Sequence, residues 1–282
     1  MSTTMKRPLM NVLILYFSAT GNTAKIAKVI EEKFKEEGVK ITMSDITPLA
    51  ERQGKIDFEP YQAVIFGAPV HTRRAPRIMR NWLRTLDGQG KKCSMFFTYG
   101  GFGAHPSHYS TRQILKEQNF IVVSSAEFLG AHTFNLGGWR AMGDRPNSLD
   151  FEVVKDYVEL TCKRFTGEDE RILGELEKTE YTEEQLDWAE SLRFKNLTQL
   201  PTRGGEECGL CLECEELCPT GAMEAESGEA EKEKCIACLA CVSNCPENAL
   251  KINDMSNSWS RKLANEKVTE ESIKEQKSKI YF

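Results

Sequence analysis

Eight cysteines with one repeated spacing are the residues of this sequence whose types and positions most clearly predict chemistry. The chain has ten cysteines, and eight of them form two runs of the pattern C-x2-C-x2-C-x3-C-P. Thiols crowded in this way in a long chain indicate metal binding and not a disulfide framework. Four-cysteine zinc sites also use C-x2-C pairs, but a third cysteine in each run favours iron–sulfur clusters. The expected ligands are Cys208, Cys211, Cys214, Cys218, Cys235, Cys238, Cys241 and Cys245.

A second candidate site is the segment 18–23, which follows a short apolar run and leads into a helical pattern. Hydroxyls, an amide and a glycine at the start of a helix could surround a phosphate group with hydrogen-bond donors. The segment has no lysine and no G-x-x-x-x-G-K-S/T pattern, which argues against a nucleotide triphosphatase. The alternative is an ordinary turn whose hydroxyls cap the helix. The residues are Ser18, Ala19, Thr20, Gly21, Asn22 and Thr23.

The elements that must position this segment form an alternating pattern over the first 165 residues. Apolar runs of strand length alternate with amphipathic helical segments. Five buried strands separated by helices predict an open parallel α/β sheet that is covered on both faces. Ligands of such sheets bind at the carboxyl ends of the strands, here the loops after Phe17, Phe66 and Thr98. The expected strands are 11–17, 39–44, 63–66, 93–98 and 121–124, and the expected helices are 23–34, 78–86, 111–117 and 151–165.

Length and charge predict two domains. The chain has 282 residues, which is long for one small domain. Residues 1–165 contain 23 Lys and Arg against 16 Asp and Glu, whereas residues 166–282 contain 14 against 26. This asymmetry indicates modules with different partners or cofactors. We expect one domain at 1–165, a helical linker at 166–199 with a helix over 182–194, a second domain at 200–253, and a charged tail at 254–282 that is helical over 268–279.

The two cysteine runs resemble the cluster-binding motif of bacterial two-cluster ferredoxins. The resemblance covers about residues 200–253 and implies a small α+β domain. It also implies one 4Fe-4S cluster on Cys208, Cys211, Cys214 and Cys245, and a second on Cys235, Cys238, Cys241 and Cys218. The glutamates around the first run form either a solvated acidic face or a surface that steers a basic partner. They are Glu206, Glu207, Glu213, Glu215 and Glu216.

The segment 18–23 and the order of the elements resemble the flavodoxin family. The resemblance covers residues 9 to about 165 and implies a flavodoxin-like, five-stranded parallel sheet that binds FMN. It implies two further loops over the flavin ring, Ala68, Pro69, Val70 and His71 in one, and Tyr99, Gly100, Gly101 and Phe102 in the other. Val70 or His71 would lie on the inner side of the ring, and Tyr99 or Phe102 on the outer side.

Together, the two halves are similar to the fused flavodoxin–ferredoxin proteins of anaerobic microbes. Clusters pass one electron at a time whereas FMN holds one or two, so the combination implies a protein that interconverts one- and two-electron steps. We expect redox partners such as a ferredoxin or an oxidoreductase, and neither nucleic acid nor membrane insertion. Because no apolar run approaches the ~18 residues that span a bilayer, we expect a cytoplasmic location.

An alternative function is an FMN-dependent reductase that passes cluster electrons to a small acceptor such as a quinone or an unsaturated acid. His71, His105, His108 or Tyr109 would then position the acceptor, and His132 after the fifth strand is a further candidate proton donor. The spacing of these residues forms no recognisable acid–base pair, so we assign no catalytic residue.

Five arginines near the second loop have two interpretations. They form either a solvated face or a docking patch for an acidic ferredoxin or for the acidic domain of the same chain. They are Arg73, Arg74, Arg77, Arg80 and Arg84. The two isolated cysteines, Cys93 and Cys162, are expected to be small buried apolar residues.

Overall fold

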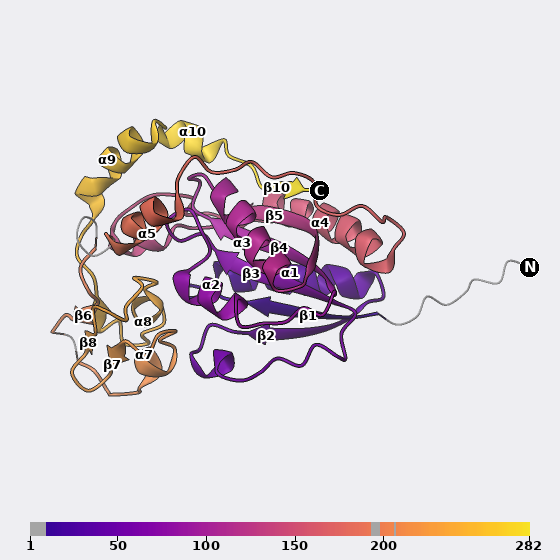
Figure 1. Ribbon diagram of the computed structural model, residues 1–282. Helices are drawn as coiled ribbons and strands as arrows, with labels where there is room; N and C mark the ends of the chain where they lie inside the picture. The colour runs from indigo at the N-terminus through magenta and orange to yellow at the C-terminus, as the bar shows by residue number, and fades with distance from the viewer. Residues whose placement is uncertain (1–9, 193–197, 206) are drawn as a thin grey trace, which may run out of the picture.

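A computed structural model describes residues 10–192, 198–205 and 207–282, and it shows a large α/β domain beside a small cysteine-rich domain (Figure 1). The sheet of the large domain has six strands in the order β10-β5-β4-β3-β1-β2. Strands β1 to β5 are parallel, as predicted, and β10 is antiparallel to β5. The strands are β1 (Asn11–Tyr16), β2 (Lys40–Asp45), β3 (Ala63–Pro69), β4 (Lys92–Tyr99), β5 (Ile121–Leu129) and β10 (Lys279–Tyr281).

Apolar side chains of the central strands point alternately to the two faces of the sheet. In β1, Val12 and Ile14 belong to one apolar cluster, whereas Leu13 and Leu15 belong to the other. The first cluster includes side chains of α1 (Asn22–Glu36) and α4 (Ser148–Thr166), and the second includes side chains of α2 (Arg77–Leu83) and α3 (His105–Glu117). The large domain is therefore the three-layer α/β arrangement that the sequence predicts.

Several element boundaries differ from the prediction. Helix α3 begins at His105, six residues before the predicted start, because Pro106 lies in its first turn, where a missing N–H costs nothing. Strand β5 continues to Leu129, while α2 ends at Leu83. Helix α4 begins with a capping box, in which the Asn147 side chain and the Asp150 side chain each bond to backbone N–H groups.

The C-terminal segment returns from the small domain to the large one (Figure 1). It consists of α9 (Ser256–Glu266), α10 (Glu270–Lys274) and β10. The predicted helix over 268–279 is too long: α10 covers only Glu270–Lys274, and Lys279 already pairs with Glu127 of β5. An edge strand carries unpaired N–H and C=O groups, and β10 satisfies those of β5. Ser278 anchors this strand: its hydroxyl donates to the buried Asp150 and accepts from Leu129 N–H at 3.0 Å.

The small domain contains a four-stranded antiparallel sheet of order β7-β8-β6-β9 and two short helices. The strands are β6 (Thr202–Arg203), β7 (Met223–Glu224), β8 (Glu229–Ala230) and β9 (Leu250–Lys251), and the helices are α7 (Glu213–Glu216) and α8 (Ala240–Ser243). Between the domains lies α5 (Glu183–Ser191); the predicted end of this helix at Phe194 is outside the described residues, as is Glu206. Among the residues that the structure describes, no helix has both the length and the apolar character to cross a bilayer.

Candidate functional site

A cavity of about 370 Å³ opens at the carboxyl ends of the parallel strands, where the three predicted loops meet. Most of the predicted flavin-site residues line it, and Gly21, Ala68 and Gly101 do not. Ala68 is buried in the core, and Gly101 backs onto Ile273 and Met142. The predicted residues at the cavity are Ser18, Ala19, Thr20, Asn22, Thr23, Pro69, Val70, His71, Tyr99, Gly100 and Phe102.

The first loop is held open by bonds to neighbouring strand ends. Gly21 has a φ of 88°, in the left-handed region that favours glycine, and α1 begins directly after it. The Ser18 hydroxyl accepts from Ala24 N–H at 3.0 Å, and the Asn22 amide donates to the Ala131 carbonyl at 2.8 Å. The Thr23 and Thr98 hydroxyls lie 2.7 Å apart. Polar side chains thus line the cavity at the N-terminal end of α1, where a helix favours an anion.

The second and third loops fix the shape of the cavity wall. His71 and Arg74 exchange backbone hydrogen bonds of 2.7 and 3.1 Å across a tight turn, whose central residues Thr72 and Arg73 have φ values of 49° and 67°. A Cβ atom at Gly100 would lie 2.5 Å from the His132 ring, so only glycine fits there. Tyr99 is buried, and burial together with the Glu127 carboxylate raises the pKa of its hydroxyl, which stays protonated.

Two elements outside the three loops also wall the cavity, and neither was predicted from the sequence. Ala189 and Leu192 reach it from α5 and the residue that follows it, and Lys262 and Glu266 reach it from α9. Lys262 Nζ lies 4.6 Å from the centroid of the Phe102 ring. Glu266 bonds to Lys262 at 2.6 Å and to Arg73 at 2.8 Å. The i,i+4 spacing of Lys262 and Glu266 was the signal available in the sequence.

Ionic contacts keep the Glu266 carboxylate of α9 ionised and hold the helix at the cavity. Burial tends to raise the pKa of Glu266, but the bonds to Lys262 and Arg73 outweigh it and leave the pKa lowered. Phe102 packs edge-on against Trp139 and Trp259, with centroids 6.3 and 6.1 Å away. The outer neighbour of the cavity is therefore an aromatic group fixed by the C-terminal segment.

Two of the five arginines are buried in ionic contacts with the linker helix, whereas Arg77 and Arg84 are exposed. Arg74 and Arg80 are 1% and 4% exposed. Arg74 bonds to Glu183 and Asp187, each at 2.6 Å, and Arg80 bonds to Glu190 at 2.9 Å. These acids lie on α5, so the two arginines hold α5 against the large domain. The interpretation as a solvated face is therefore wrong for Arg74 and Arg80. The sequence could not show this, because ion pairs between residues over 100 positions apart leave no periodic pattern.

The other candidate histidines differ in position. His71 and His132 line the cavity, whereas His105, His108 and Tyr109 do not. His108 is buried, with Nδ1 2.6 Å from the Ser125 hydroxyl and Nε2 3.1 Å from Glu127. Burial lowers the pKa of His108 despite the nearby carboxylate. His108 is therefore a buried structural residue beside β10.

The eight clustered cysteines line two separate cavities in the small domain. Cys208, Cys211, Cys214 and Cys245 line one, and Cys218, Cys235, Cys238 and Cys241 line the other. We call residues 208–214 the outer loop and residues 235–241 the inner loop. In the described part of the chain, no three His, Cys, Asp or Glu side chains are placed to hold a single metal ion. Four thiols around a cavity are a donor set that fits an iron–sulfur cluster.

The fourth cysteine of each run has the same backbone environment. Ala222 N–H donates to Cys218 Sγ at 3.2 Å, and Ala249 N–H donates to Cys245 Sγ at 3.2 Å. Burial tends to raise the pKa of Cys245, but backbone N–H groups outweigh it and lower the pKa. Such bonds favour the thiolate, which is the form that binds metal.

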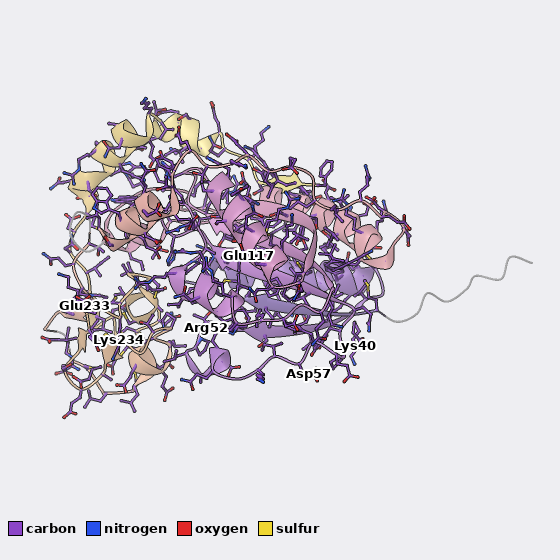
Figure 2. All side chains as sticks on the ribbon, viewed as in Figure 1. Lys40, Arg52, Asp57, Glu117, Glu233 and Lys234 are labelled. Atoms are coloured by element: carbon purple, nitrogen blue, oxygen red, sulfur yellow. The ribbon has the colours of Figure 1, made fainter. Side chains whose placement is uncertain are left out.

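The small domain contacts the large domain through residues next to the inner set of cysteines. The Asn244 amide donates to the carbonyl of Ala19 at 3.2 Å, and Arg52 donates to the carbonyl of Pro219. Figure 2 shows Arg52 at the border between the two domains, while Glu233 and Lys234 lie on the far side of the small domain. Cys238 belongs to the same apolar cluster as Ala19. The two candidate cofactor sites therefore adjoin each other.

Comparisons with known proteins agree with this division. Residues 13–124 match the family model of the flavodoxin domain, and residues 200–246 match the model of the 4Fe-4S dicluster domain. The chain thus has an N-terminal flavodoxin domain and a C-terminal 4Fe-4S dicluster domain, the arrangement of the flavodoxin/ferredoxin fusion family. It is a flavin and iron–sulfur protein of electron transport. A search of curated proteins found no match.

Three similar solved structures each cover little more than half of this chain. A flavodoxin from the domain Archaea is 18% identical over 55% of this chain and 98% of its own, with a TM-score of 0.41. Oxidised Flavodoxin 2 from Bacillus cereus is 17% identical over 55% of this chain and 99% of its own, with a TM-score of 0.43. Rubredoxin oxygen:oxidoreductase from Desulfovibrio gigas is 19% identical over 57% of this chain, with a TM-score of 0.42; this chain spans only 37% of its length.

Proposed function

We propose that the protein transfers electrons between two 4Fe-4S clusters and FMN and so connects one-electron partners with two-electron steps. When bound, clusters exchange single electrons and FMN one or two. The observation that carries the proposal is the contact between the two sites, in which Asn244 of the cysteine-rich domain bonds to Ala19 of the first flavin loop. Electron transfer requires cofactors that lie close together, and a contact between the two candidate sites supports such an arrangement.

The residues divide the work as follows in this proposal. The segment 18–23 holds the FMN phosphate at the start of α1, and the loops at Pro69–His71 and Tyr99–Phe102 hold the ring. Cys208, Cys211, Cys214 and Cys245 hold one cluster, and Cys218, Cys235, Cys238 and Cys241 hold the other. We propose a cytoplasmic location, because closely spaced thiols that bind metal suit a reducing compartment, and partners that are redox proteins.

The test is a cofactor analysis of protein purified without oxygen. We expect about eight iron atoms and one FMN per chain, together with a resonance signal from two interacting clusters after reduction. Zinc in place of iron, or protein without flavin, would show that the proposal is wrong. Ser variants of Cys211 and Cys238, one from each set, should each remove about half of the iron.

A second candidate function is the reduction of a small molecule by the bound flavin. The observation that favours it is the wall formed by α5 and α9, which covers the cavity with Leu192 and Lys262. Such a wall would limit access to the bound flavin to small acceptors, which a protein that only carries electrons does not need. Saturable turnover with a quinone or an unsaturated acid, lost in Lys262→Glu and retained in the exposed control Lys234→Glu, would establish this activity. Linear, unsaturable rates with every acceptor would reject it.

A further inference from the structure

The outer and inner loops share one backbone conformation but differ completely in exposure. Leu210 and Leu212 of the outer loop have φ values of 53° and 66°, and the corresponding Ala237 and Leu239 of the inner loop have values of 52° and 59°. Leu210 and Leu212 are 49% and 48% exposed, whereas Ala237 and Leu239 are 0% and 1% exposed. The difference therefore lies in what covers each loop and not in how each loop folds.

The large domain covers the inner loop. Leu239 belongs to the same apolar cluster as Tyr99 and Trp139, and Ile236 and Ala240 belong to the cluster that contains Ala19. This contact joins the inner cysteines to the flavin loops. The tip of the inner loop is thus an apolar surface on which another domain of the chain packs.

The corresponding tip of the outer loop is not covered by any part of the chain that the structure describes. Cys211 is exposed between the two exposed leucines, whereas Cys238, at the corresponding position, is 7% exposed. Exposed glutamates lie next to this apolar tip in the chain, and Glu247 accepts from Gly209 N–H at 2.8 Å. Exposed apolar side chains inside a charged rim are typical of protein interfaces. The rim residues are Glu207, Glu213, Glu216 and Glu247.

We propose that the outer loop docks a separate one-electron redox protein that has an apolar patch within a basic rim, in the way that the inner loop packs on the flavodoxin domain. The inference rests on the proposed function and adds the order in which electrons pass between the partner, the two clusters and the flavin. A cluster held by the outer cysteine set would exchange single electrons with the partner, and a cluster held by the inner set would exchange them with the flavin. Each electron gained by the outer cluster would be one lost by the partner, and two successive transfers would supply a two-electron step. The same path runs in either direction.

The first test compares two exposed leucines. Leu212→Lys places a positive charge in the proposed docking surface, and Leu149→Lys changes a 67% exposed leucine on α4 as a matched control. Reduced protein is mixed with oxidised cytochrome c of net positive charge, whose haem iron takes up one electron. We expect the bimolecular rate to fall about tenfold in Leu212→Lys and to stay within about twofold of wild type in the control. Wild-type rates should fall with added salt.

The second test uses the corresponding inner residue. Leu239→Lys disturbs the packing of the inner loop on the flavin loops, so we expect cluster reoxidation at the wild-type rate and flavin reoxidation slowed about tenfold. Leu212→Lys should instead slow both phases equally. Iron content, flavin content and the resonance spectrum of each variant show whether its cofactors are intact. If Leu239→Lys loses iron, the conservative Leu239→Ala replaces it.

Two results would overturn the inference. One is an equal rate of cytochrome reduction in Leu212→Lys and Leu149→Lys. The other is flavin reoxidation that ignores the inner-loop variant, because electrons would then leave through another face. Failure of the proposed function is distinguishable, since wild-type protein would then lack iron or flavin before any kinetic measurement.

Discussion

Glu190 on α5 gives the sharpest test of how the cavity is closed. Its carboxylate accepts from Arg80 at 2.9 Å, from Arg74 at 3.3 Å and from the backbone N–H of Arg77 at 3.3 Å. The Glu190 side chain is 12% exposed, whereas the side chain of Asp187 is 64% exposed. Glu190 is therefore the best-shielded acid in the contact, and Glu190→Gln should release α5 more than it damages the rest of the fold.

The magnitude follows from the charges that remain. A hydrogen bond to a charged group contributes about 1.5–3 kcal/mol, and removal of one partner leaves two buried arginines short of charge. The amide keeps the size and part of the bonding, so we expect detachment of α5 to become easier by about 2–3 kcal/mol. At ~1.4 kcal/mol per factor of ten, this raises the detached population about 30- to 150-fold.

Hydrogen exchange of the α5 amides measures this population directly. Glu184→Gln is the matched control, because Glu184 lies on the same helix but is exposed and bonds to its first turn. It should change the exchange of α5 by less than about twofold. FMN should also dissociate faster from Glu190→Gln, since α5 supplies Ala189 to the cavity. Equal exchange in the two variants would refute the assignment of Arg74 and Arg80 as the anchor of α5.

Three further predictions concern stability and the flavin site. Burial lowers the pKa of His108, so near pH 6.5 the unfolded chain binds a proton that the folded chain does not. The free energy of unfolding should therefore fall as the pH drops below that value. Urea midpoints should show a less steep fall in His108→Gln. Gly100→Ala should weaken FMN binding measured by fluorescence, because its methyl group would lie 2.5 Å from the His132 ring, while Gly143→Ala, with open space around it, should not. Ser278→Ala leaves a buried carboxylate and a buried N–H short of a partner, and it should cost about 1–3 kcal/mol in denaturation experiments.

Local patterns explain what could be predicted from the sequence. The cysteine spacing, the segment 18–23 and the five parallel strands each depend on residues that are close together in the chain. The early start of α3 was also available locally, since Pro106 marks the first turn of a helix. The helix expected over 111–117 left His108 before its start, whereas α3 includes it.

Contacts between distant segments could not be predicted in this way. Strand β10 has three residues, too few for a period, and it pairs with residues about 150 positions earlier. The roles of Arg74 and Lys262 likewise depend on partners from other elements, Glu183 for the first and the Phe102 ring for the second. A positively charged side chain is expected to be exposed to solvent unless an acidic partner is known. The contacts of Arg74 and Lys262 also hold α5 and α9 at the cavity.

The pairing of β10 with β5 sets an order for the synthesis of the protein. On the ribosome, the flavodoxin strands and then all eight clustered cysteines emerge before Lys279. At about 5–20 residues per second, the 36 residues that separate Cys245 from Tyr281 take a few seconds to translate. During that interval the edge of β5 is open and the cysteines are already available for cluster assembly. The last strand therefore completes the flavin-binding sheet only after the cluster-binding segment has been made.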